Sequence, residues 1–171
     1  MSGARLELSG VGKSFRGLRA VHDVSFAVPA GTIQALIGPN GAGKTTIFNM
    51  IAGVFAPDAG TVTLDGRVIS GLRPDRICAA GVGRTFQLVK PFKGLTVLEN
   101  VTIGALHRRP DLGEARDSAA AILSRLGLYD RRHQLAESLT LPDRKRLEVA
   151  RALATGPKLL LLDEVMAGLR P

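Results

Sequence analysis

A glycine-rich segment that contains one lysine and two threonines is the part of the sequence best suited to chemistry. It reads Gly38-Pro39-Asn40-Gly41-Ala42-Gly43-Lys44-Thr45-Thr46. Glycines can take positive φ and let the backbone approach an anion, so that successive N–H groups line one concavity. Lys44 supplies a positive charge toward phosphates, and the Thr45 hydroxyl can ligate Mg²⁺. The spacing favours a nucleotide phosphate-binding loop over its alternative, an ordinary glycine-rich turn.

The elements on either side of this loop can be predicted from their apolar residues. Residues 32–37 are mostly apolar and predict a strand that enters the loop. Residues 47–52 predict a helix that leaves it and ends near Gly53. The order strand, loop, helix is the context that a phosphate loop requires, and the helix adds its positive N-terminal end.

A second chemical group follows the leucine-rich segment 158–162, which predicts a buried strand of a parallel sheet covered on both faces. The segment ends in Asp163-Glu164. Acidic residues at the carboxyl end of a parallel strand point into the crevice where ligands bind. Asp163 can hold Mg²⁺ through water, and Glu164 can orient and deprotonate an attacking water. The alternative is a charged pair that only ends a strand.

The other segments divide into a strand-rich first half and a helical middle. Alternating residues predict strands at 5–9, 21–28 and 61–64, a hairpin turn at 65–66 before 67–69, a short helix at 74–80 closed by a glycine, and a strand at 82–87. Thr96 and Glu99 form a capping box, and residues 114–126 have helical spacing. Residues 90–140 therefore predict a helical subdomain inserted into an α/β core. Thr140 is expected to cap a further helix.

Composition limits the classes of function. The chain has 171 residues, 45% apolar and 22% charged, typical of one globular domain. Aromatic residues make up only 4%, which leaves little for stacking on nucleic-acid bases, so no nucleic-acid partner is expected. The net charge of +8 fits a solvated surface, or a face toward nucleotide or membrane. Cys78 is the only cysteine, so an internal disulfide is excluded. No apolar run has the length of a membrane span and no signal peptide is evident, so a cytoplasmic location is expected.

The chain resembles the ATPase subunit of an ABC transporter over nearly its whole length. Residues 38–45 match the Walker A loop, and residues 159–163 followed by Glu164 match Walker B with its catalytic glutamate. The resemblance implies that Phe15 stacks on adenine and that Gln87 is the Q-loop glutamine, which joins Mg²⁺ to the membrane partner. Four segments, 83–87, 92–100, 146–153 and 167–169, resemble the branched-chain amino-acid uptake ATPases. Lipopolysaccharide-export ATPases share much of this pattern.

The resemblance implies an α/β P-loop NTPase fold in residues 1–171, with a mainly parallel sheet, an N-terminal antiparallel β subdomain and the helical subdomain. It implies a subunit that binds and hydrolyses ATP with Mg²⁺ to power an importer of branched-chain or other hydrophobic amino acids. Its partners would be transmembrane permease subunits, a second ATPase subunit and, indirectly, a solute-binding protein, at the inner face of the membrane. The alternatives are a nucleotide-dependent regulatory module with little hydrolysis and a lipopolysaccharide-export ATPase.

The sequence departs from the family at the signature loop, which contacts the ATP held by the opposite subunit. Here that loop is Thr140-Leu141-Pro142-Asp143. Pro142 has no N–H, and losing one hydrogen bond to a charged group costs about 1.5–3 kcal/mol. Asp143 adds negative charge near a phosphate, which is repulsive unless Arg144 or Lys145 compensates it. We therefore expect a heterodimer with an ATPase whose signature is intact.

Two further departures concern the end of the chain. Arg170 occupies a position where the family usually has Asp or Asn. The chain ends at Pro171, before the family's switch histidine, and His22, His107 and His133 all precede the Walker B strand. The expectation is a fragment whose hydrolysis is weak when it acts alone.

Overall fold

The computed structural model describes residues 6–85 and 91–163. The chain divides into two compact units, Met1–Val82 and Gly83–Pro171, and each is described by itself. Gln87, Glu164 and Arg170, which the sequence singled out, lie outside the described residues.

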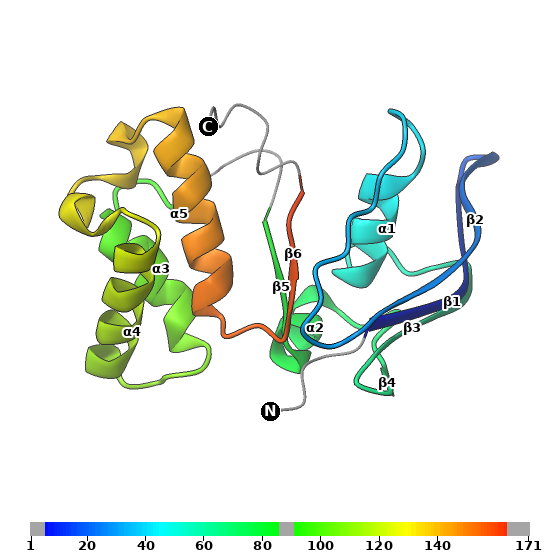
Figure 1. Ribbon diagram of the computed structural model, residues 1–171, viewed down its shortest axis with the longest axis horizontal. Helices are drawn as coiled ribbons and strands as arrows, with labels where there is room; N and C mark the ends of the chain where they lie inside the picture. Colours follow the sequence, from blue (N-terminus) through cyan, green and yellow to red (C-terminus); the bar gives the residue numbers. More distant parts are fainter. Residues whose placement is uncertain (1–5, 86–90, 164–171) are drawn as a thin grey trace. The chain divides into compact units, whose positions relative to one another are not determined.

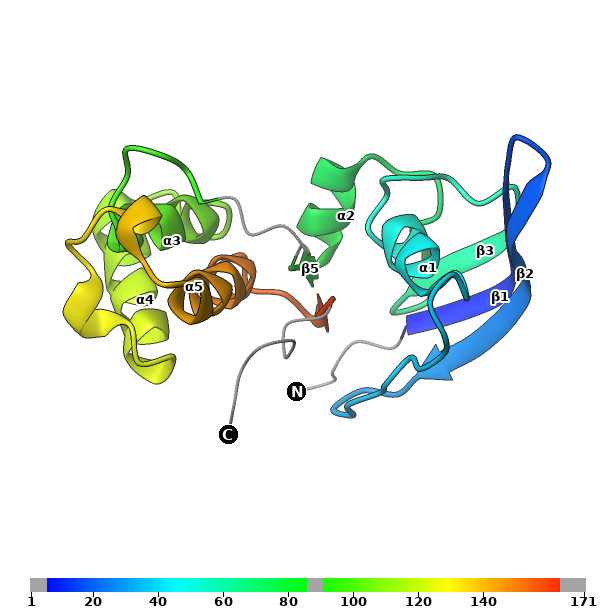
Figure 2. The same ribbon diagram turned by 90° about the horizontal axis from the view of Figure 1, so that it is seen from above.

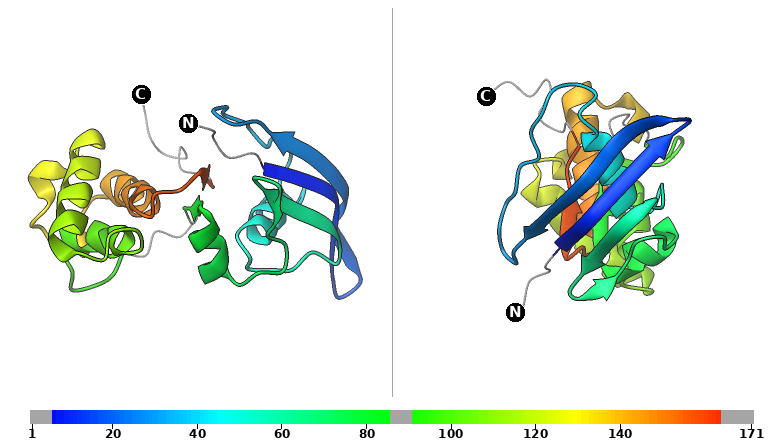
Figure 3. Two further views of the ribbon diagram at one scale, coloured as in Figure 1. Left: turned by 90° about the horizontal axis from the view of Figure 1, so that it is seen from below. Right: turned by 90° about the vertical axis from the view of Figure 1, so that its right-hand side faces the viewer.

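The first unit contains a four-stranded antiparallel sheet, which confirms the predicted N-terminal β subdomain (Figures 1 and 3). Its strands are β1 (Leu6–Phe15), β2 (Leu18–Val28), β3 (Ala59–Leu64) and β4 (Arg67–Val68), in the order β2-β1-β3-β4. Leu8 pairs with Phe26 of β2 on one side and with Val62 of β3 on the other. The hairpin turn at Asp65 and Gly66 is confirmed, with φ of 50° and 75°. Strands β1 and β2 are longer than predicted because they pair with each other from Leu6 and Val28 to Phe15 and Leu18.

The described residues of this unit also form two helices. Helix α1 (Lys44–Ile51) covers one face of the sheet and buries Ile47, Met50 and Ile51 (Figure 2). It ends before Gly53, as predicted. Helix α2 (Pro74–Ala80) has the predicted bounds. Proline is favoured at the first helical position, and the φ of 112° at Gly81 suits a residue without Cβ.

The predicted strand at residues 32–37 is wrong, because this segment forms no strand. Ile33 and Ile37 have exposed fractions of 102% and 89%. An apolar segment becomes a buried strand only when neighbouring strands pair with it and other elements cover it. The four strands of the first unit pair with one another and leave this segment outside their sheet.

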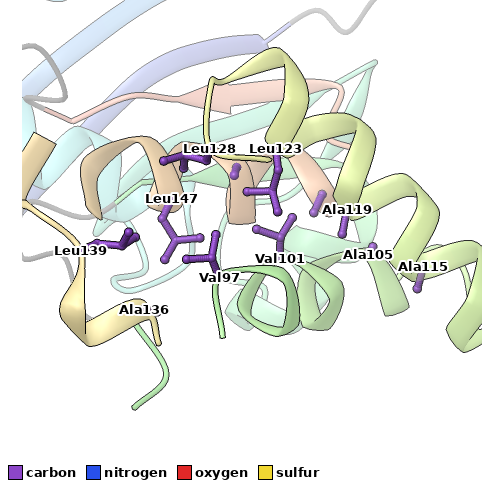
Figure 4. Packing of buried hydrophobic residues seen from close by; sticks show 12 residues of the cluster. Val97, Val101, Ala105, Ala115, Ala119, Leu123, Leu128, Ala136, Leu139 and Leu147 are labelled. Carbon is purple, nitrogen blue, oxygen red and sulfur yellow. The ribbon is translucent and has the colours of Figure 1, made fainter. Parts of the chain in front are cut away.

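The second unit is built around three helices that pack together. They are α3 (Val97–Leu106), α4 (Leu112–Arg125) and α5 (Leu141–Ala154). Two 3₁₀ turns, η1 (Tyr129–Arg131) and η2 (Ala136–Ser138), connect α4 to α5. Figure 4 shows Val97, Val101 and Leu147 meeting at the centre of a buried cluster that also includes Leu123 and Leu128. The predicted helical character of this region is therefore confirmed, and its role as an inserted subdomain stays a prediction.

Two further strands pair with each other: β5 (Val82–Arg84), which begins at the last residue of the first unit, and β6 (Leu159–Leu161). The Thr85 N–H donates to the Leu161 carbonyl oxygen at 3.0 Å, which places the carboxyl ends of both strands side by side. The strands are therefore parallel. The expectation that residues 158–162 are covered on both faces is wrong for Leu162, which is 49% exposed. None of the helices that the structure describes is both long and apolar enough to cross a membrane.

Candidate functional site

The glycine-rich loop has the backbone shape that anion binding requires. Gly41 and Gly43 have φ of 82° and 83°, in the left-handed region that other residues rarely adopt. The Ala42 N–H donates to the Pro39 carbonyl oxygen at 3.2 Å, which closes a turn within the loop. Helix α1 starts directly after Gly43, with no side-chain cap and no acidic residue in its first turn. Its first N–H groups and its positive end therefore lie at the loop.

The Lys44 side chain folds back over this loop. Its ammonium group donates to the Gly38 carbonyl oxygen at 2.6 Å and to the Pro39 carbonyl oxygen at 2.7 Å. An ammonium group has three donors and no acceptor, so it can bond phosphate oxygens from the same position. The positive charge is thus fixed beside the N–H groups of the loop. The residues present fit a nucleotide's phosphates.

The predicted Mg²⁺ ligands lie in different units. Thr45 is exposed in the first turn of α1, and Asp163 follows β6 in the second unit. Among the described residues no three His, Cys, Asp or Glu side chains form a metal-binding group. Mg²⁺ that arrives with a nucleotide is usually held by one or two carboxylates together with phosphates and water. Thr45 and Asp163 both carry oxygen ligands, which Mg²⁺ prefers, so their ligand chemistry fits this metal.

Phe15, the predicted adenine contact, ends β1 and is half-buried. Its ring meets that of Phe55 edge to face, with centroids 5.1 Å apart. The Lys13 ammonium lies 5.7 Å from the centre of the Phe15 ring and 2.6 Å from Asp58 Oδ1. The hydrogen bond from Lys13, and a second from the Ser14 N–H, lower the pKa of Asp58. Phe55 and Asp58 had not been singled out from the sequence, because no motif links them to Phe15.

Asp163 has an ionic partner that the sequence prediction missed. The Arg84 guanidinium, from the end of β5, lies 3.4 Å from Asp163 Oδ2, and the two side chains are 8% and 12% exposed. Burial lowers the pKa of Arg84, and the Asp163 carboxylate acts in the opposite direction. The Asp163 N–H donates to Thr85 Oγ1 at 3.2 Å. Arg84 directly precedes Thr85 in the segment that resembles the Q-loop region, but its residue type alone did not indicate this contact.

The signature segment lies at the start of α5, and two of its side chains form hydrogen bonds within the segment. Thr140 Oγ1 accepts a hydrogen bond from the Asp143 N–H at 3.4 Å and donates to Asp143 Oδ2 at 2.7 Å. Thr140 therefore caps the helix, as predicted. Pro142 lies in the first turn, where its missing N–H costs the helix nothing, and Leu141 is 63% exposed.

Asp143 pairs with two arginines that were not considered for this role from the sequence. Its ion pairs are with Arg131, from η1, and with Arg146, at 3.4 Å. Arg144 instead donates to the carbonyl oxygens of Leu139 and Glu137, at 2.9 Å and 2.6 Å. The Asp143 side chain is only 9% exposed, because helix and 3₁₀ turn close over it. Arg131 was missed because it lies twelve residues earlier, and only the fold brings it to the start of α5.

Three features define a P-loop nucleotide-binding protein: the loop with its two positive-φ glycines, the Lys44 ammonium held over it, and the uncapped N-terminus of α1. A family profile described as ABC transporter matches residues 21–167 of the chain. The chain therefore belongs to the ABC transporter family, as an ATP-binding subunit of the ATPase class.

Individual relatives agree with this assignment. The high-affinity branched-chain amino acid transport ATP-binding protein LivG of Salmonella typhimurium is 41% identical over 187 residues, covering 100% of this chain and 73% of LivG. BraF of Pseudomonas aeruginosa, with the same description, is 40% identical at the same coverage. The lipopolysaccharide export system ATP-binding protein LptB of Escherichia coli K12 is 38% identical over 170 residues, covering 98% of this chain and 70% of LptB.

Solved structures show the same fold class. The ADP conformation of MJ1267, an ATP-binding cassette of an ABC transporter, aligns with a TM-score of 0.84 and 33% identity. The alignment covers 100% of this chain and 72% of that one. A Clostridium perfringens cbiO1 structure, part of the cbiONQ complex, aligns with a TM-score of 0.85, 27% identity, and coverage of 97% and 67%. The predicted α/β P-loop fold and the predicted family are confirmed.

Proposed function

We propose that this chain is the ATP-binding subunit of an importer for branched-chain or other hydrophobic amino acids. The observation that carries the proposal is the Lys44 ammonium held over a loop shaped by two left-handed glycines. Such a loop binds the phosphates of a nucleotide. The choice of solute rests on the likeness to LivG and BraF, whose names state branched-chain amino acid transport.

Different residues of the chain have different roles in this function. Residues Gly38 to Thr46 hold the phosphates, with the Lys44 ammonium as the charged donor. Phe15 stacks on adenine, with its ring oriented by Phe55. Thr45, Asp163 and Gln87 hold Mg²⁺, which supplies charge neutralisation at the phosphates. Glu164 orients and deprotonates the attacking water.

The partners follow from the same function. Transmembrane permease subunits convert nucleotide binding into transport, and a solute-binding protein delivers the amino acid to them. The chain would sit at the inner face of the membrane through the permease. The closed start of α5, with Asp143 held by two arginines, supports a heterodimer with a second ATPase subunit whose signature loop is intact.

Two experiments test the proposal. The purified chain should bind a fluorescent ATP analogue with Mg²⁺, and Lys44→Ala should remove most of the binding. Lys93→Ala, an exposed lysine in a turn, is the matched control. Absence of binding by the folded wild-type chain would refute the nucleotide site.

The transport role is tested in cells of the source organism that lack the gene. Radiolabelled leucine, isoleucine and valine uptake should fall, and the wild-type gene should restore it while Lys44→Ala should not. The similarity to LptB makes lipopolysaccharide export the competing function. Normal amino-acid uptake together with a permeable outer membrane would favour export instead.

A further inference from the structure

The ion pair between Arg84 and Asp163 lies where two parallel strands end. Arg84 is the last residue of β5, and Asp163 comes two residues after β6. The Arg84 Nη2 and Asp163 Oδ2 atoms are 3.4 Å apart, and both side chains are largely buried. An ionised group that leaves water needs a partner, so each charge makes the other tolerable in this position.

The Asp163 backbone is held by a contact separate from the ion pair with Arg84. The Asp163 N–H donates to Thr85 Oγ1 at 3.2 Å, and the Thr85 N–H donates to the Leu161 carbonyl oxygen at 3.0 Å. Thr85 is fully buried. The pairing of the two strands therefore holds the Asp163 backbone, and the Arg84 guanidinium pairs with the Asp163 carboxylate.

The contact between Arg84 and Asp163 is long enough for another cation to replace the guanidinium. Charge-assisted N–H···O bonds are usually about 2.7–2.9 Å long. The 3.4 Å separation is longer, so this bond contributes less than an optimal one would. A divalent cation carries twice the charge of a guanidinium and prefers carboxylate oxygen, so it can take the place of Arg84 at this carboxylate.

We propose that Arg84 is a positioning residue that neutralises Asp163 in the metal-free protein and competes with the Mg²⁺ of MgATP for its carboxylate. The inference rests on the proposed function, in which Asp163 is one of the Mg²⁺ ligands. Arg84 keeps the carboxylate paired before MgATP arrives and limits binding of divalent ions without nucleotide. Metal affinity is thereby coupled to release of the guanidinium.

The first test measures Mn²⁺ binding by electron paramagnetic resonance, with the full chain and a non-hydrolysable ATP analogue. Arg84→Gln should raise Mn²⁺ affinity by about threefold or more, since the competing charge is gone. Arg84→Lys keeps a charge on a shorter donor group, and its affinity should lie between those of wild type and Arg84→Gln. Arg73→Gln, which alters an exposed arginine paired with Asp75, is the control and should change nothing. Unchanged or weaker Mn²⁺ binding in both Arg84 variants would overturn the proposal.

The second test separates metal competition from a structural role. In EDTA, Arg84→Gln should unfold at lower urea than wild type, because Asp163 loses its counter-ion. Mn²⁺ with the nucleotide analogue should close that gap, whereas a merely structural arginine would leave it open. In an Asp163→Asn background, Arg84→Gln should no longer affect Mn²⁺ affinity, and an effect that persists would count against competition at this carboxylate. If no form of the folded chain binds the analogue, the proposed function itself fails, and this result is distinct from an unchanged Mn²⁺ affinity.

Discussion

Gly43 of the phosphate loop lies directly against the backbone of Ala20 in β2. A Cβ at Gly43 would be 2.5 Å from the Ala20 carbonyl oxygen and 3.0 Å from Val21 Cγ2. Because β2 cannot move away without disturbing its pairing with β1, the sheet fixes where the loop turns into α1. The antiparallel sheet thus helps to set the position of the Lys44 charge.

The two left-handed glycines of the loop should respond differently to alanine. Gly43→Ala adds a backbone clash to the strain of positive φ, and we expect a loss of about 2–4 kcal/mol in the free energy of unfolding, together with lost ATP binding. Gly41→Ala has the same φ but nothing within 4 Å of its Cβ, so it should cost only about 1–2 kcal/mol. Urea unfolding and binding of a fluorescent ATP analogue measure both effects. Equal losses in the two variants would show that the contact with Ala20 is unimportant.

A glycine also allows α3 and α5 to approach closely. A Cβ at Gly104 would be 2.7 Å from the Arg151 carbonyl oxygen and 3.1 Å from Ala154 Cβ. In an isolated helix Gly→Ala is stabilising by about 1 kcal/mol, but here the helices would have to separate, and we expect a net loss of about 1–3 kcal/mol. Urea unfolding measures it, with Ile103→Ala, a 43% exposed side chain on the same helix, as control. A more stable Gly104→Ala variant would contradict the close packing.

Stability of the helical unit should depend on the ionisation of Glu99. Its carboxylate accepts the Thr96 N–H at 2.7 Å, and this bond and the one from the Thr96 hydroxyl lower the pKa of Glu99 from 4.5. The lowered pKa means that the stabilisation is complete above the unfolded-state pKa. It is then lost as the pH falls through the lower pKa of the folded state.

Glu99→Gln gives the matching experiment for this pH dependence. Glutamine can still accept the Thr96 N–H but carries no charge, so the variant should be less stable than wild type at pH 7. The difference should start to shrink below about pH 4.5, the unfolded-state pKa, and disappear as the pH falls through the lower pKa of the folded state. Glu114→Gln, an exposed acid in the first turn of α4, serves as control. A difference that stays constant from neutral to acidic pH would exclude the ionised capping box as its cause.

Local signals predicted the elements that depend on local structure. Pro74 and Gly81 fix the bounds of α2, and Thr96 with Glu99 starts α3, because caps act within a few residues. Residues 32–37 could not be assigned in this way. A strand depends on pairing partners from elsewhere in the chain, and the strands of the first unit do not supply them.

In the candidate site, too, local features could be predicted from the sequence and long-range contacts could not. The glycines and Lys44 could be predicted because their spacing within one short segment carries the chemistry. Arg84 and Arg131 could not, since each meets its aspartate through contacts that form only when distant segments fold together. From the sequence, only the neighbours Arg144 and Lys145 were considered for charge compensation at Asp143, and the structure adds ion pairs with Arg131 and Arg146.

Replacing Asp143 should lower the free energy of unfolding more than replacing an exposed acidic residue does. Asp143→Ala removes the ion pairs to Arg131 and Arg146 and the hydrogen bond from the Thr140 hydroxyl. Both arginines are half exposed and can regain water, so the loss should be moderate, about 1–3 kcal/mol. Urea unfolding measures it, with the exposed Asp117→Ala on α4 as control. Thr140→Ala should cost about 0.5–2 kcal/mol through loss of the cap, while Thr140→Ser should stay close to wild type. If Asp143→Ala were as stable as Asp117→Ala, the arginines would not be holding the start of α5, and the structural argument for an altered signature loop would fail.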